Sequence, residues 1–347
     1  MASTLLAHHP WTKHPLIISA PMRLIALAPL AVAVSQAGGL GFIGAGSDLN
    51  DLTNQLKHAK ALFLDNHIKS EVLPVGVGFI NWGADFQLAL DILANHIPAV
   101  AWFFAPERNQ DLLRWSTGVR DVTQGRTKIW IQIGTVADAV EVANLCNPDV
   151  LVVQGADAGG HGLERGAGII TLLPEVADAM QAIGKGNINL VAAGGIAEGR
   201  GVAACLALGA EGVVMGTRFL ASEEANIAKG YQDDVLKSSD GGVRTVRSKV
   251  YDTLRGTTGW PDRYGGRGII NESYMDAVNG EVTDEMKRLY EKALTKGDEG
   301  WGEHGRLTAY AGTAIGLVHQ VSPAHEIVSE VRSQALKLFS PPHTSKL

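Results

Sequence analysis

The sequence predicts an α/β fold of the (β/α)8 TIM-barrel class, and three observations support this prediction. Eight short apolar segments alternate with segments whose apolar residues recur at helical spacing. The later apolar segments stop at glycines or at a glutamine, as strands do where their C-terminal ends carry a binding site. The length of 347 residues leaves room for a barrel and an insertion.

A doubly wound sheet is the alternative fold. Such a sheet does not normally need eight successive strand and helix units. A dinucleotide-binding version would also carry a G-x-G-x-x-G motif at the opening of its first helix, whereas the glycines between Gly38 and Gly46 flank an apolar segment instead. The barrel is therefore favoured.

The first half of the chain supplies five strands. Each is a short run of apolar residues, as in strands that are buried on both faces. The intervening segments have helical spacing, and Leu52, Leu56, Ala59 and Phe63 share one face of the second. The expected strands are residues 16–19, 40–45, 74–80, 99–104 and 129–133. The expected helices are residues 26–36, 49–63, 86–95, 109–119 and 137–145.

Three more strands complete the count of eight. They are expected at residues 150–153, 188–192 and 212–215. A helix from about 174 to 183 separates the first two. Residues 198–208 separate the last two, with apolar residues at helical spacing through Val202, Cys205, Leu206 and Leu208.

Three units follow from this pattern. Residues 1–221 are expected to form the barrel. Residues 222–308 are polar and glycine-rich, with short helices near 275–277 and 285–294, and are predicted to be a cap inserted after the eighth strand. Residues 309–347 should contain a closing barrel helix at 324–338 and a tail. Four aromatic residues are candidates for the substrate side, although packing within the cap explains each equally well: Trp260, Tyr264, Trp301 and Tyr310.

Composition narrows the class of protein. A net charge of −6 without blocks of like charge argues against nucleic-acid binding, which needs a basic face. No apolar run approaches the roughly 18–20 residues of a membrane span. Cys146 and Cys205 are too few for a disulfide framework or a metal cluster, and no metal is expected because neither HExxH nor paired CxxC occurs. Small-molecule chemistry in a soluble, unsecreted protein is the expectation.

Two stretches carry the candidate site. Residues 151–168, LVVQGADAGGHGLERGAG, run from a strand into a glycine-rich bend that holds His161. Residues 190–220 form a βαβ unit whose strands stop at Gly194-Gly195 and at Gly216-Thr217. Backbone N–H groups in such loops bind phosphate, characteristically after strands seven and eight of a barrel. Arg218 is expected to add a charged contact, and bulk at Gly194 or Gly216 should fill the space of the phosphate.

These stretches resemble a known family. QGADAGGHG, AAGGIAEGRG and GVVMGTRF, together with APM at residues 20–22, look like the FMN-dependent nitronate monooxygenases, formerly called 2-nitropropane dioxygenases, in their fungal-type form. The resemblance spans most of residues 17–220, in the same order, so it is more specific than any single glycine motif.

The resemblance implies a flavin enzyme that uses O2. FMN would bind with its phosphate at the two glycine loops and its ring beside the APM segment. His161 would act as a general base on the acidic α-proton of a nitroalkane, and the products would be a carbonyl compound and nitrite. Asp157 is either an orienter of the loop or an Asx turn. The cofactor-binding residues expected at this edge are Ala20, Pro21, Met22, Gln132, Gln154, Gly155, Gly160, Ala193, Gly194, Gly195, Gly216 and Thr217.

Other functions remain open at this point. A flavin reductase that reduces quinones or an enoyl thioester with NAD(P)H would use a similar glycine and histidine loop on the same barrel. A binding or regulatory barrel would have little use for the histidine. The chain ends in Ser345-Lys346-Leu347, a tripeptide that the peroxisomal import receptor reads at a true C-terminus. Peroxisomal localisation is therefore expected, and an oligomer is possible.

Overall fold

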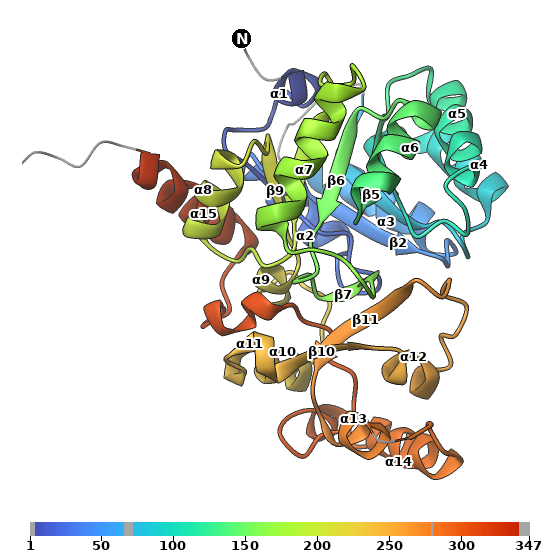
Figure 1. Ribbon diagram of the computed structural model, residues 1–347, viewed down its shortest axis with the longest axis vertical. Coiled ribbons are helices and arrows are strands. Elements are labelled where there is room, and N and C mark those ends of the chain that lie inside the picture. The colour runs from blue at the N-terminus through green and yellow to red at the C-terminus, as the bar shows by residue number, and fades with distance from the viewer. Residues whose placement is uncertain (1–3, 66–71, 279, 340–347) are drawn as a thin grey trace, which may run out of the picture.

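The computed structural model describes residues 4–65, 72–278 and 280–339, and within them the predicted barrel is confirmed. Eight parallel strands form one sheet in the order β1-β9-β8-β6-β5-β4-β3-β2. A parallel bridge between Ile18 and Leu40 joins the two ends of this sheet, so the barrel is nearly closed (Figure 1). The strands are β1 Leu16–Ser19, β2 Phe42–Gly46, β3 Leu73–Ile80, β4 Pro98–Phe104, β5 Lys128–Ile133, β6 Val150–Gln154, β8 Asn189–Ala193 and β9 Gly212–Met215.

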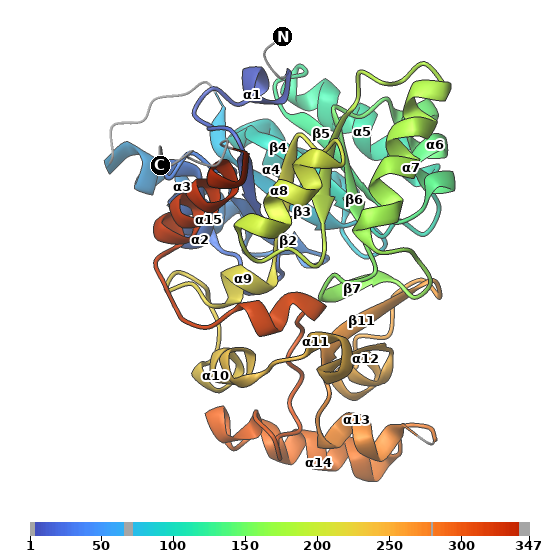
Figure 2. The same ribbon diagram turned by 60° about the vertical axis from the view of Figure 1, so that its left-hand side comes forward.

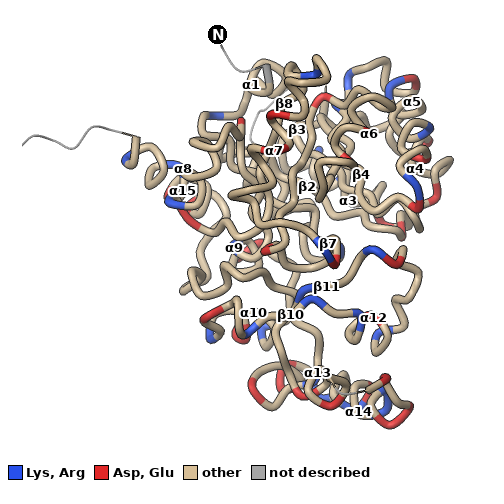
Figure 3. Tube along the Cα trace, in the orientation of Figure 1, with Lys and Arg blue, Asp and Glu red and all other residues tan. Residues whose placement is uncertain are grey.

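Helices surround the strands, and the last one closes the ring. α15 (Ala324–Phe339) packs against α8 and α2 and so takes the place of the helix that should follow β9. The other ring helices are α2 Ala28–Gln36, α3 Leu52–Asp65, α4 Phe86–His96, α5 Asp111–Thr123, α6 Val136–Cys146, α7 Ile169–Ala182 and α8 Gly199–Ala207. In the view of Figure 3 charged positions of both signs lie on outer helices such as α4, α5 and α15 and on the smaller elements around α13 and α14, and the barrel strands are mostly uncharged.

Alternate residues of each strand point to two separate cores. In β1, Ile17 faces the layer between strands and helices, while Leu16 and Ile18 face the barrel interior. The interior is filled by large rings, with Phe42 and Trp102 in edge contact at 5.1 Å between centroids. Because every strand is apolar on both sides, the sequence reads as continuous apolar runs instead of an alternating pattern.

The N-terminal segment covers one end of the barrel. Leu5 in α1 (Thr4–His8) packs on the barrel interior, and His9 lies in ring contact with Trp11 and Trp130. Neither ring nitrogen of His9 has a hydrogen-bond partner in the described residues. Burial, with Lys128 and His8 nearby, lowers the pKa of His9 to about 3, so this imidazole is neutral near pH 7.

Smaller elements cover the opposite end of the barrel, below it in Figures 1 and 2. A three-stranded antiparallel sheet has the order β10-β11-β7, with β10 at Thr245–Ser248, β11 at Tyr264–Ile269 and β7 at Gly160–Leu163. The remaining elements are α9 Thr217–Leu220, α10 Lys229–Lys237, α11 Gly241–Arg244, α12 Val250–Arg255, α13 Glu272–Ala277, α14 Asp284–Leu294, η1 Gly297–Gly300 and η2 Thr313–Leu317.

The sequence prediction was wrong at two elements. The bend expected around His161 is strand β7, which pairs with β11, so that His161 lies opposite Gly266. Neither strand has a clear apolar alternation, and their pairing is remote in sequence, so no local pattern indicated it. α7 begins at Ile169, not near Pro174, and Pro174 lies inside the helix. Apolar contacts of Ile169, Leu172 and Leu173 favour the earlier start.

Other expectations concern positions outside the site. Cys146 and Cys205 are free and buried, as predicted, and burial raises the pKa of Cys205 to about 11. Among the described residues, no helix is long and apolar enough to cross a membrane. Ser345-Lys346-Leu347 lies outside the described residues.

Candidate active site

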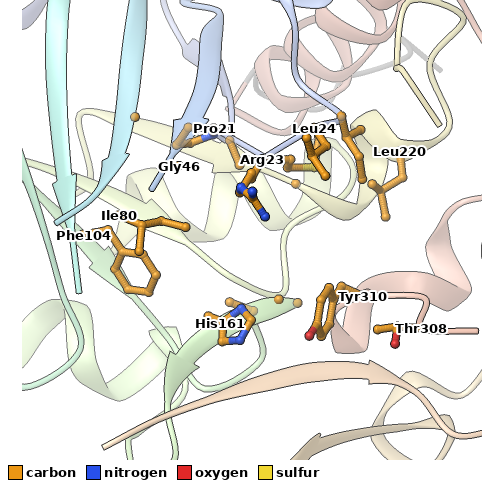
Figure 4. A pocket seen from close by; sticks show the side chains of 18 of the residues that line it. Pro21, Arg23, Leu24, Gly46, Ile80, Phe104, His161, Leu220, Thr308 and Tyr310 are labelled. Atoms are coloured by element: carbon orange, nitrogen blue, oxygen red, sulfur yellow. The ribbon is translucent and has the colours of Figure 1, made fainter. Parts of the chain in front are cut away.

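A cavity of about 790 Å³ opens where the C-terminal ends of the barrel strands face the smaller elements. Figure 4 shows Pro21 and Arg23 on one side of the open space and His161 and Tyr310 on the other, with Phe104 at its flank. Its volume lies in the range of roughly 300–1,000 Å³ that is typical of small-molecule sites. This cavity is therefore large enough for a small-molecule ligand, and it lies at the predicted end of the barrel.

Nearly all of the predicted site residues line this cavity. They lie in, or follow, five strands of the barrel, and they meet because these strands are parallel: β1, β5, β6, β8 and β9. Gln132 accepts a hydrogen bond from the indole Nε1 of Trp102 at 3.1 Å, which fixes its amide inside the barrel mouth. The predicted residues at the cavity wall are Ala20, Pro21, Met22, Gln132, Gln154, Gly160, His161, Ala193, Gly194, Gly195, Gly216 and Thr217.

Three candidates do not line the cavity. Gly155 lies against the start of α7, where a Cβ would meet the backbone nitrogen of Ile169 at 2.7 Å. The expectation for Arg218 was wrong, because its guanidinium is buried and donates to the carbonyl oxygens of Ala221 and Gln320 at 3.3 Å. Tyr264 lines a small neighbouring pocket, whereas Trp260, Trp301 and Tyr310 line the main cavity.

The two glycine loops differ in what a side chain would do. Gly194 has φ +98°, and its Cβ would meet the carbonyl oxygen of Gly155 at 2.9 Å and Ala158 at 3.0 Å. A side chain at Gly194 would therefore clash with the loop after β6 as well as alter the proposed phosphate site. At Gly216 the nearest atoms would be Ala20 Cβ at 3.6 Å and Met22 Sδ at 3.9 Å, which leaves space toward the cavity.

The loop after β9 can receive an anion. Gly216 precedes α9, and the first N–H groups of a helix have no acceptor within it. Gly194 and Gly195 both adopt positive φ after β8, which bends the backbone beside the same cavity. An open glycine surface next to free N–H groups suits a phosphate group.

His161 projects from β7 into the cavity and is held by a carboxylate. Its Nε2 lies 2.8 Å and 3.0 Å from the two carboxylate oxygens of Asp252, a buried residue of α12. The imidazole stacks on the indole of Trp260, with centroids 3.6 Å apart and an interplanar angle of 5°. Only 12% of the His161 side chain is exposed, so its position is set by these two neighbours.

Asp252 accepts further hydrogen bonds. Thr257 Oγ1 donates to Asp252 Oδ1 at 3.0 Å, and the Tyr310 hydroxyl donates to the same oxygen at 3.2 Å. Burial and the adjacent carboxylate raise the pKa of Tyr310, which keeps this hydroxyl protonated as a donor. Sequence reasoning missed Asp252, because it lies in a six-residue helix without a motif.

A buried arginine supports the loop that carries His161. The Arg247 guanidinium donates to the carbonyl oxygens of Ala158 at 2.6 Å and Gly160 at 2.9 Å, and to Gly265 at 2.6 Å. Burial lowers the pKa of Arg247 to about 10, which still leaves it charged near pH 7. Arg247 thus ties the loop after β6 to β11 by charge-assisted bonds.

Asp157 acts on the same loop from its other side. Its carboxylate accepts from Thr313 Oγ1 at 3.1 Å, and its carbonyl oxygen accepts from the Thr313 N–H at 3.0 Å. Of the two expected roles, these contacts favour an orienter of the loop.

The barrel, the glycine loops at its mouth and the hydrogen-bonded pair of His161 and Asp252 are features of a barrel enzyme with a small-molecule site. A family model described as nitronate monooxygenase matches residues 86–333. The chain is 49% identical to nitronate monooxygenase npaC of Metarhizium robertsii, over 95% of this chain and 94% of that protein. It is 37% identical to a nitronate monooxygenase of Neurospora crassa, over 94% of this chain and 90% of that protein. The chain therefore belongs to the nitronate monooxygenase family of oxidoreductases.

Solved structures share the fold. A nitroalkane oxidase from Streptomyces ansochromogenes aligns with a TM-score of 0.74 at 22% identity, covering 96% of this chain and 98% of that one. FabK from Thermotoga maritima aligns with a TM-score of 0.72 at 25% identity, covering 97% of each chain. These likenesses include the elements beyond the barrel as well as the barrel itself.

Proposed function

We propose that this protein oxidises nitronates, and nitroalkanes after deprotonation, with a bound FMN and O2. The observation that carries the proposal is the place of His161, which faces the same cavity as the glycine loops in a chain of this family. The substrates are small nitro compounds, and the products are a carbonyl compound and nitrite.

The chain offers a fitting site for FMN. Its phosphate would be held by the loops at Gly194-Gly195 and Gly216-Thr217, where Gly216 leaves space and the N–H groups of Thr217 and Arg218 have no acceptor within α9. The ring system would lie by Ala20, Pro21 and Met22 on the wall opposite His161. When bound, FMN supplies the electron acceptor for the nitronate and the site of reaction with O2.

His161 provides the acid–base step for a neutral nitroalkane. An imidazole suits this step because its ordinary pKa range lies near the pH of the cell. Residues 222–308 would act as a cap that covers the cavity, and they contribute Asp252, Trp260 and Trp301 to its walls. A covered site excludes water and holds the substrate against the base.

The test uses the purified protein and two forms of one substrate. The visible spectrum should show a flavin, which denaturation should release as FMN. Oxygen consumption should follow addition of a pre-formed alkyl nitronate and, more slowly, of its parent nitroalkane. Inactivity on both forms combined with rapid flavin reduction by NAD(P)H would contradict the proposal and favour the quinone or enoyl-thioester reductase alternative.

We further propose that Ser345-Lys346-Leu347 directs the protein to peroxisomes through the import receptor. The support is the tripeptide itself, with Pro341 and Pro342 before it.

A further inference from the structure

We propose that Asp252 is a positioning residue that fixes the tautomer of His161, so that Nδ1 is the basic atom. The inference rests on the proposed role of His161 as the base and adds a second residue to it. Asp252 contacts His161 through Nε2, and it lies 91 positions away in sequence.

The tautomer follows from the hydrogen-bonding capacity of the two groups. An ionised carboxylate can only accept, and both of its oxygens lie within 3.0 Å of Nε2. The ring must therefore donate Nε2–H, and a neutral imidazole then has its lone pair on Nδ1.

The carboxylate of Asp252 accepts two hydrogen bonds besides the one from His161. Two hydroxyl groups, of Thr257 and Tyr310, donate to Oδ1. The carboxylate is buried, so these donors replace the water that it would otherwise bind. Arg255 lies over the Tyr310 ring, with its Cζ 5.6 Å from the ring centroid, and adds positive charge beside the pair.

The orientation of the ring is fixed as well. The parallel stack on Trp260 restricts tilting of the imidazole, and Tyr310 meets it edge-on with centroids 5.3 Å apart. The Gln154 side chain donates to the carbonyl oxygen of His161 at 3.2 Å, which fixes the backbone from which the ring projects. A ring held by its Nε2, its face and its backbone can present only its other nitrogen to a substrate.

The chemical step is a single proton transfer. The α C–H bond of the nitroalkane breaks, and its proton forms a bond to Nδ1. The electron pair of the C–H bond becomes the C=N bond of the nitronate, whose negative charge lies on the two oxygens. The imidazolium that results carries protons on both nitrogens, and the Asp252 carboxylate faces its Nε2–H.

The first test reads the tautomer directly. The holoenzyme is labelled with ¹⁵N in its 11 histidines, and the His161 signals are assigned by their loss in His161→Asn. At a pH where the ring is neutral, Nε2 should be protonated and Nδ1 should show the shift of an unprotonated nitrogen. In Asp252→Asn, whose amide can donate as well as accept, the two tautomers should mix. A protonated Nδ1 in the wild type would overturn the proposal.

The second test compares two substrates. Asp252→Asn should lower turnover of a nitroalkane by roughly 10- to 10³-fold, because the base is misoriented or in the wrong tautomer. Oxidation of the pre-formed nitronate should change by less than about 3-fold, because no carbon-bound proton is removed. Asp262→Asn, which removes an exposed carboxylate from the same cap, should match the wild type on both substrates.

The outcomes separate this inference from the proposed function. If Asp252→Asn loses equal activity on both substrates at normal flavin content, Asp252 has only a structural role. If Asp252→Asn does not fold, the ¹⁵N shifts of His161 in the wild type and in Tyr310→Phe still test which nitrogen carries the proton. Tyr310→Phe keeps the carboxylate of Asp252. Tyr310→Phe should keep the Nε2–H tautomer. If His161→Asn loses the same factor of turnover on the nitroalkane and on the nitronate, His161 is not the general base. The ¹⁵N shifts of wild-type His161 still test its contact with Asp252 in that case.

Discussion

Replacing Gly216 by valine should remove the cofactor without unfolding the barrel. The backbone at Gly216 has φ −102°, which an L-amino acid adopts without strain. The new Cβ would make ordinary contacts at 3.6 Å and 3.9 Å, and the rest of the side chain would enter the cavity at the proposed phosphate position. The free energy of unfolding should therefore change by less than about 1 kcal/mol.

The loss of affinity can be worked from the contacts that valine would displace. Two hydrogen bonds from backbone N–H groups to a charged phosphate contribute about 1.5–3 kcal/mol each, or about 3–6 kcal/mol together. A free energy of about 1.4 kcal/mol corresponds to tenfold in affinity, so FMN should bind roughly 10²- to 10⁴-fold more weakly.

The assay is the flavin content of purified Gly216→Val, with titration of FMN into the stripped protein. Gly242→Val is the matched control, because Gly242 has no atom within 4 Å of its Cβ position and lies in α11, away from the residues that line the cavity. Gly194→Val is less informative, because its clash with Gly155 and Ala158 could lower both the stability of the fold and the affinity for FMN. Full flavin content and unchanged affinity in Gly216→Val would refute the phosphate site.

Three further predictions concern other parts of the molecule. Burial holds the pKa of His9 near 3, below its unfolded value of 6.5, so stability from this group is complete above about pH 7.5 and falls as the pH drops. In urea unfolding, the free energy of unfolding should fall by about 2 kcal/mol between pH 7.5 and pH 5 because of His9. In His9→Phe this decrease should be smaller. An equal decrease in both proteins would argue against a neutral buried imidazole. Arg247→Met should lower the free energy of unfolding by about 2 kcal/mol or more, because buried carbonyl oxygens of the His161 loop lose their donor. Turnover of the nitroalkane and of the nitronate should fall by the same factor. Thermal melts and oxygen uptake check this, and a normal melting temperature would contradict it. A reporter with the native C-terminus should collect in peroxisomes and move to the cytosol without Ser345-Lys346-Leu347, whereas cytosolic signal in both cases would show that the tripeptide is accidental.

Much of the barrel could be predicted from the sequence because its strands are buried on both faces. Runs such as residues 150–153 and 212–215 are apolar throughout, and parallel topology then brings their C-terminal ends to one edge. The glycine loops were predictable for the same reason, since Gly194 and Gly216 directly follow such strands, and His161 lies seven residues after the end of β6.

The contact between His161 and Asp252 could not be predicted, because it depends on the packing of residues that lie 91 positions apart in sequence. Asp252 looks like any acidic residue of a short helix until α12 is placed beside β7. The β7 and β11 pairing joins two glycine-rich segments without apolar alternation. Arg218 directly follows the glycine loop, and only the fold shows that its side chain turns toward Ala221 and Gln320 instead of the cavity.

The proposed function depends on His161 as the base that removes the α-proton of a nitroalkane, in a site that otherwise oxidises nitronates. The most direct measurement is oxygen consumption by wild type and His161→Asn, each at matched flavin content, with a neutral nitroalkane and with its pre-formed nitronate. His161→Asn should lose roughly 10²- to 10⁴-fold on the nitroalkane and much less on the nitronate, because only the first substrate has a proton to lose. An equal loss on both substrates would contradict the claim and make His161 a residue that binds or orients the substrate.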